Sequence, residues 1–152
     1  MTRSKAPLAM MEQMVMLLVF ALAAALCLQA FVKSDEMSKR GEARDRAAAL
    51  CQNAAETLRA TGGDFSWAEK QLRPEGGAVS ESTEDALLIG YDEDWNEPSA
   101  HGKATCYNLR AQRVDSGTAG LSKAAVWVEL FEGEDEPLFE IEVAWQEVSP
   151  HG

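Results

Sequence analysis

An apolar segment near the start of the chain constrains what this protein can fold into more than any other feature. The segment begins at Met14, ends at Val32, carries no charge and is interrupted only by Gln29. A helix rises by about 1.5 Å per residue, so a helix over residues 14–32 would be about 28 Å long, close to the hydrocarbon thickness of a bilayer. The segment therefore predicts a single membrane-spanning helix, with membrane lipid as its partner.

Two other interpretations of this segment are open at the level of sequence. Basic residues lie upstream of it, Arg3 and Lys5, as they do in a secretory signal peptide. The cleavage chemistry is poor, because a cut after Ala23 would leave a short apolar core and a cut after Ala30 would follow a leucine at Leu28. A buried helix of a soluble protein is the third interpretation. We expect a retained anchor.

Helical chemistry continues beyond the apolar segment. Five apolar residues recur at helical spacing and form one stripe: Ala47, Leu50, Cys51, Ala54 and Leu58. The pair Gly62 and Gly63 is a helix stop. We therefore expect one continuous helix from about residue 8 to about residue 60, roughly 80 Å long. Two helices hinged near Gly41 are the alternative, and in either case the stripe needs a surface to cover it.

The rest of the chain predicts a small mixed domain. Asp64 is the expected N-cap of a short helix over residues 65–72, which ends before Pro74. Residues 76–84 are expected to form a loop. Four later segments have strand character: residues 86–91, 104–114, 124–131 and 138–148. The last two alternate apolar with polar residues and are expected to form an antiparallel hairpin through residues 133–137.

The predicted fold class is therefore α+β, a long N-terminal helix packed on a small antiparallel sheet of three or four strands. The first half of this helix is expected to span the membrane, and the sheet is expected to cover the apolar stripe of its second half. The expected divisions are a leader-like segment (1–7), the membrane half of the helix (8–33), its amphipathic half (34–62) and the head (63–152).

Charge separates the head from the helix. The chain carries a formal charge of −11. Residues 63–152 hold 6 Lys and Arg against 19 Asp and Glu, a net charge of −13. Residues 1–62 hold 8 Lys and Arg against 6 Asp and Glu, a net charge of +2. Nucleic acid is disfavoured as a partner, because phosphate binding requires a basic face.

The sequence shows no recognisable active site, and we expect a non-enzymatic protein without cofactor or metal. Asp92, Asp94 and Asn96 have the spacing of a calcium loop's first ligands, but Glu97 replaces the glycine that such a loop requires. His101 and His151 each lack a credible catalytic or zinc partner.

Cysteine pairing is left open by the sequence. Cys27 lies inside the apolar segment and is expected to behave as a small apolar residue. Cys51 and Cys106 form a candidate disulfide if the head is exported, and two buried free thiols are the equal alternative.

Glu12 is the one charged residue that abuts the apolar segment. A carboxylate in that position is costly unless it stays at the interface or meets a positive partner. It marks the headgroup boundary in one interpretation, and in the other it meets a cation supplied by another chain.

These features together resemble the type IV pilin-like proteins, a group that includes pilins and the pseudopilins of type II secretion systems. The likeness rests on a short basic leader, an apolar helix with one early glutamate, an amphipathic continuation and a small antiparallel head. If Leu8 is the first residue after processing, Glu12 is the fifth, where the family keeps its glutamate. Pro7 stands where the family's leader ends in glycine or alanine.

The resemblance implies a structural subunit, a minor pilin or pseudopilin, that is stored in the membrane and assembled into a filament through its helix. It implies that a prepilin peptidase cuts between Pro7 and Leu8 and methylates the new amino terminus. Glu12 would then pair with the amino terminus of a neighbouring pilin subunit, and the assembly machinery would be a further partner. The head would lie outside the cytoplasm, at the cell surface or in a periplasmic filament.

One sequence observation competes with the orientation that the resemblance implies. The Lys and Arg residues that follow the span outnumber those before it, and this count would keep the head in the cytoplasm. The competing function is a single-pass membrane-anchored, or secreted, interaction domain that does not polymerise.

Overall fold

The computed structural model describes residues 6–73, 80–98, 104–131 and 136–146, with side chains from residue 9 onward. The chain divides into two compact units, residues 1–42 and 43–152. Helix α1 (Ala6–Ala60) supplies all of the described first unit and the opening element of the second. It continues through Gly41 without interruption, which confirms one long helix in place of two.

The end of α1 is set by the predicted glycine pair. Gly62 and Gly63 both have positive φ, 65° and 83°. The Gly63 N–H donates to the Leu58 carbonyl at 2.8 Å and the Gly62 N–H to the Arg59 carbonyl at 3.3 Å, the paired bonds of a Schellman motif. These bonds satisfy carbonyls at the end of the helix and reverse the chain toward helix α2 (Phe65–Leu72).

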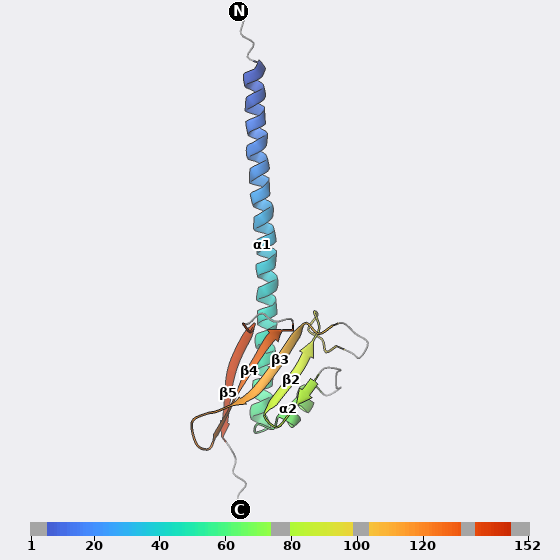
Figure 1. Ribbon diagram of the computed structural model, residues 1–152, viewed down its shortest axis with the longest axis vertical. Coiled ribbons are helices and arrows are strands. Elements are labelled where there is room, and N and C mark those ends of the chain that lie inside the picture. Colours follow the sequence, from blue (N-terminus) through green and yellow to red (C-terminus); the bar gives the residue numbers. More distant parts are fainter. Residues whose placement is uncertain (1–5, 74–79, 99–103, 132–135, 147–152) are drawn as a thin grey trace, which may run out of the picture. The chain divides into compact units, whose positions relative to one another are not determined.

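The head contains a five-stranded antiparallel sheet in which each strand pairs with the next along the chain (Figure 1). The strands are β1 (Ser80–Ser82), β2 (Ala86–Tyr91), β3 (Tyr107–Val114), β4 (Leu121–Leu130) and β5 (Phe139–Gln146). The prediction of a three- or four-stranded sheet is therefore wrong by one strand, β1. The four predicted strands are all present, and the predicted β4–β5 pairing is confirmed.

Strand β1 lies inside the predicted loop. Its sequence, Ser-Glu-Ser, has no apolar alternation, so sequence periodicity could not reveal it. It pairs with β2 through its backbone, from Ser80 opposite Ile89 to Ser82 opposite Leu87. The serine side chains matter as well, because Ser82 donates a hydrogen bond to the Glu69 carboxylate of α2.

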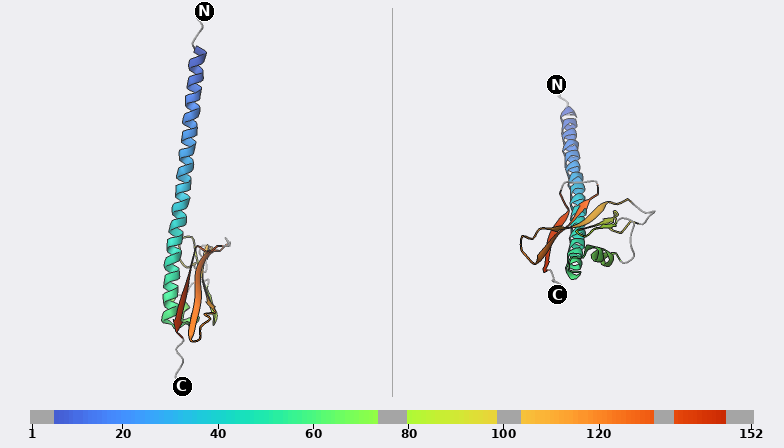
Figure 2. Two further views of the ribbon diagram at one scale, coloured as in Figure 1. Left: turned by 90° about the vertical axis from the view of Figure 1, so that its left-hand side faces the viewer. Right: turned by 60° about the horizontal axis from the view of Figure 1, so that its bottom comes forward.

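The sheet buries one face against the second part of α1, as the left view of Figure 2 shows. The predicted stripe supplies the helix side of this core, because Ala47, Cys51, Ala54 and Leu58 are each 0% exposed. Leu87, Leu109, Val126 and Val128 are among the residues that supply the sheet side. The expectation that the sheet covers the stripe is therefore confirmed. The core of the second unit lies between the sheet and α1, and Phe65 and Ala68 of α2 also belong to it.

Helix α2 (Phe65–Leu72) covers the sheet beside α1, over β1 and β2 (Figure 1). Asp64 caps it as predicted, because its side chain accepts the Trp67 N–H at 2.9 Å. Phe65 and Ala68 are the residues that α2 buries.

Candidate functional site

The first part of α1 is exposed along its whole described length. Every side chain from residue 9 to residue 42 is exposed, including large apolar ones such as Met14 at 75%, Phe20 at 74% and Phe31 at 75%. This helix is long and apolar enough to be a candidate membrane span. Water solvates an apolar surface of this extent poorly.

Glu12 lies at the start of this surface. Its side chain is exposed, and it has no ion-pair partner among the residues that the structure describes. Pro7 and Leu8 fall in the first turn of α1, and their side chains lie outside the described part, as does the rest of the leader-like segment up to residue 5. The described residues therefore leave the Glu12 carboxylate available to a group from outside the chain.

A charged stretch follows the apolar segment on α1. Lys33 pairs with Glu36 at 3.6 Å, and the Lys39 ammonium lies 2.7 Å from the Asp35 carboxylate. The hydrogen bond with Asp35 raises the pKa of Lys39. These pairs join residues three and four positions apart, so they reinforce the helix where the apolar segment gives way to polar sequence.

The two cysteines of the candidate disulfide are free thiols in this structure. Cys51 is fully buried in the stripe, and burial raises the pKa of its thiol to about 12. Cys106 is half-buried and precedes β3, where its N–H donates to the Tyr91 carbonyl at 2.7 Å. Only Cys51 has the burial that the free-thiol alternative expected for both residues, and the disulfide stays a prediction.

The acidic loop after β2, residues 92–97, is stabilised by hydrogen bonds within the loop. The buried Asp92 carboxylate accepts the N–H groups of Asp94 and Asn96, both at 2.9 Å. The turn places Trp95 at a φ of 64° and stacks its ring on Tyr107, with ring centres 3.9 Å apart. Asp92 is therefore the acceptor that closes its own turn.

Arg113 links three parts of the head that the sequence did not connect. Its guanidinium donates to Asp85 at 2.7 Å, to the Ser122 hydroxyl at 3.1 Å and to the Gly63 carbonyl at 3.2 Å. It also lies over the rings of Phe65 and Trp145. The side chain therefore joins the end of α1 to the sheet.

Arg73 has a comparable role at the end of α2. Its side chain is 3% exposed and pairs with Glu97 at 2.9 Å and with Glu69 at 3.5 Å. Hydrogen bonds from Ser80 and Ser82 lower the pKa of Glu69, and the Arg73 charge lowers it further. Sequence analysis missed both arginines; Arg73 carried no signal beyond its position beside a helix end and a proline.

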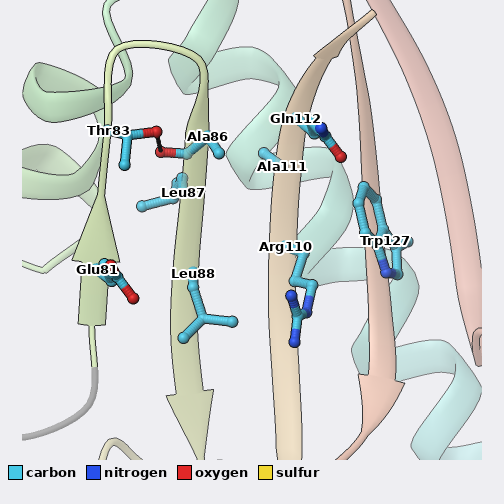
Figure 3. Close-up of a pocket in the computed structure, with 9 residues that line it drawn as sticks. All are labelled: Glu81, Thr83, Ala86, Leu87, Leu88, Arg110, Ala111, Gln112 and Trp127. Atoms are coloured by element: carbon cyan, nitrogen blue, oxygen red, sulfur yellow. Dashed lines mark hydrogen bonds between the residues drawn. The ribbon is translucent and has the colours of Figure 1, made fainter.

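The outer face of the sheet has a shallow pocket of about 350 Å³ (Figure 3). Leu88, Arg110 and Trp127 line it and occupy directly opposite positions on β2, β3 and β4. Glu129 orients two of these side chains, because it lies 2.6 Å from Arg110 and accepts the Trp127 indole N–H at 3.0 Å. The pocket therefore presents the Arg110 guanidinium, held by Glu129, beside an indole and an aliphatic side chain.

No cluster of metal-ligating side chains is present among the described residues. His101 and His151 lie outside them. No protein-family model, curated protein or solved structure matches this chain. The features that can carry function are thus the exposed half of α1 with Glu12, and the surfaces of the head.

Proposed function

We propose that this protein is a structural, non-enzymatic subunit of a type IV pilus-like or type II secretion-like filament, a minor pilin or pseudopilin. The proposal rests on the division of α1 into two surfaces. Residues 9–42 are exposed, whereas the stripe from Ala47 to Leu58 is buried under an antiparallel sheet. One part of the helix thus packs against the sheet of the head, and the other part presents an apolar surface that other molecules can contact.

That second surface suits both storage and assembly. In lipid the backbone of the apolar segment is satisfied within the helix, and the apolar side chains contact acyl chains. In a bundle of like helices the same side chains contact apolar neighbours. The transfer between the two environments therefore leaves no backbone polar group without a partner.

Glu12 supports an assembly role for this surface. An exposed carboxylate beside an apolar segment loses hydration when like helices surround it, and a positive group compensates for that loss. The free amino terminus of a neighbouring subunit, produced by cleavage between Pro7 and Leu8, is the cation that we propose.

Mass spectrometry of the amino terminus, on protein purified from the native host, tests this function. A mature chain that begins at Leu8 with a methylated amine is the expected result. A chain that retains Met1 or Thr2 contradicts the proposal, because an uncleaved leader leaves no free amino terminus at Leu8.

A second candidate function has its own support. The outer-face pocket presents Arg110 and Trp127, and these residue types are common in protein interfaces. A single-pass membrane-anchored domain that binds a partner through its head, without polymerising, would use such a surface. The intact amino terminus described above is the result that favours it.

A further inference from the structure

Strand β5 is the longer of the two edges of the sheet. It contains eight residues, whereas the opposite edge strand, β1, contains three. Figure 2 shows α1 along one face of the sheet, so the helix covers a face and not this edge. An edge strand presents backbone donors and acceptors that another strand can pair with.

A hydrogen bond at the start of β5 indicates which β5 backbone groups point outward. The Leu138 N–H donates to the Val128 carbonyl at 2.8 Å, so the backbone polar groups of Val128 point toward β5. Val128 is opposite Phe139, and hydrogen-bonded pairs alternate along an antiparallel ladder. The backbone groups of Glu140, Glu142 and Ala144 therefore point away from β4, at the open edge.

The two faces of β5 differ in chemistry. Glu140 and Glu142 are exposed on the outer face, whereas Ile141 and Val143 are half-buried on the helix side. Glu142 pairs with Lys123 at 2.6 Å. Glu140 is opposite Trp127 and has no ion-pair partner within the described residues. The edge therefore offers a negative outer row above a half-buried apolar row.

This pattern defines the strand that would fit. Side chains of an added strand alternate between the same two faces, so basic residues would lie opposite Glu140 and Glu142 with apolar residues between them. A second copy of β5 fits poorly, because it would place glutamates against glutamates. We propose that β5 accepts an extended segment of a partner protein in which basic and apolar residues alternate, by addition of that segment to the sheet.

The probe is a nine-residue peptide that alternates lysine with valine, titrated onto the full chain in detergent micelles. We expect it to bind at least about ten-fold more tightly than a peptide of the same composition with the lysines grouped, since grouping destroys the two-face match. Hydrogen exchange should show new protection at the Glu140, Glu142 and Ala144 amides. Equal binding of the two peptides, or protection elsewhere, would overturn the proposal.

Two variants separate this edge from general attraction to an acidic protein. Glu140→Lys should weaken binding of the alternating peptide by about five-fold or more, because it reverses the charge opposite a lysine. Glu56→Lys makes the same charge change on an exposed helix position and should leave the affinity within about two-fold. Similar losses in both variants would overturn the proposal. The test does not involve filament assembly, so its failure would leave the proposed function intact.

Discussion

At the scale of single residues, Gly63 is a position where an added side chain would collide with the core. A Cβ added there would collide with the Trp145 ring, whereas one added at Gly62 would meet nothing within 4 Å. Both glycines have positive φ, so alanine costs about 1 kcal/mol at either site from backbone strain. We expect Gly63→Ala to cost a further 1–3 kcal/mol or so from overpacking.

Chemical denaturation of the full chain in micelles, followed by tryptophan fluorescence, measures this difference. Gly62→Ala is the matched control, because it has the strain without the collision. Equal free energies of unfolding for the two variants would mean that Trp145 moves aside freely.

Cys51 makes stability depend on alkaline pH. Its folded pKa of about 12 exceeds the ordinary thiol value of 9.0, so the unfolded chain loses the thiol proton first as the pH rises. Stability from this group is complete below pH 9 and declines by about 1.4 kcal/mol per unit between pH 9 and 12.

The variant Cys51→Ala isolates that contribution, since burial also raises the pKa of Tyr91 to about 12 and adds its own alkaline loss. The free energy of unfolding of this variant should decline less between pH 8 and 10.5 than that of the parent. Cys106→Ala is the control and should keep the parental slope. Parallel slopes for all three proteins would contradict the prediction.

At the scale of elements, Arg73 determines whether β1 and the acidic loop stay attached to α2. Replacing it by methionine leaves the Glu69 and Glu97 carboxylates without their cation. Because both carboxylates are partly exposed, we expect a loss of about 1–3 kcal/mol, below the cost of breaking a fully buried pair. Hydrogen exchange at β1 should accelerate more than exchange at β3, and the control Arg59→Met should change neither.

Glu69, which pairs with Arg73, makes stability fall at acidic pH, whereas Cys51 makes it fall at alkaline pH. The folded pKa of Glu69 lies below its ordinary value, mainly through hydrogen bonds from Ser80 and Ser82. Its contribution is therefore present above the ordinary carboxyl pKa and is lost as the pH falls through the folded pKa. Exchange at β1 should accelerate on acidification in the parent and less so in Glu69→Gln. An identical pH response in the two proteins would contradict this role.

At the scale of the whole molecule, the proposed function predicts separate effects on insertion and assembly. Glu12→Ala should leave membrane insertion unchanged, because the apolar segment is intact. Recruitment into a filament should fall, because the proposed cation loses its partner. Membrane fractionation and filament counts in the native host measure the two effects. The matched control is Glu36→Ala beyond the apolar segment, and normal filaments from Glu12→Ala would refute the assigned role.

The sequence by itself determined the long helix, its stop at Gly62 and Gly63, and the stripe that the sheet covers. These are local features, since helical spacing, a charge-free segment and positive φ each depend on a few neighbouring residues. It also determined the four longer strands from their strand character, and the apolar residues of the last two alternate. Glu12 was found from sequence as well, although its role is still a proposal.

Only the tertiary structure decided how polar residues are used. Strand β1 has no apolar pattern and exists through its pairing with β2 and its serine contacts with Glu69. Arg73 and Arg113 join segments up to 50 positions apart, and the open backbone of β5 depends on which strand ends the sheet. Such contacts depend on residues distant in the chain, so no local pattern in the sequence specifies them.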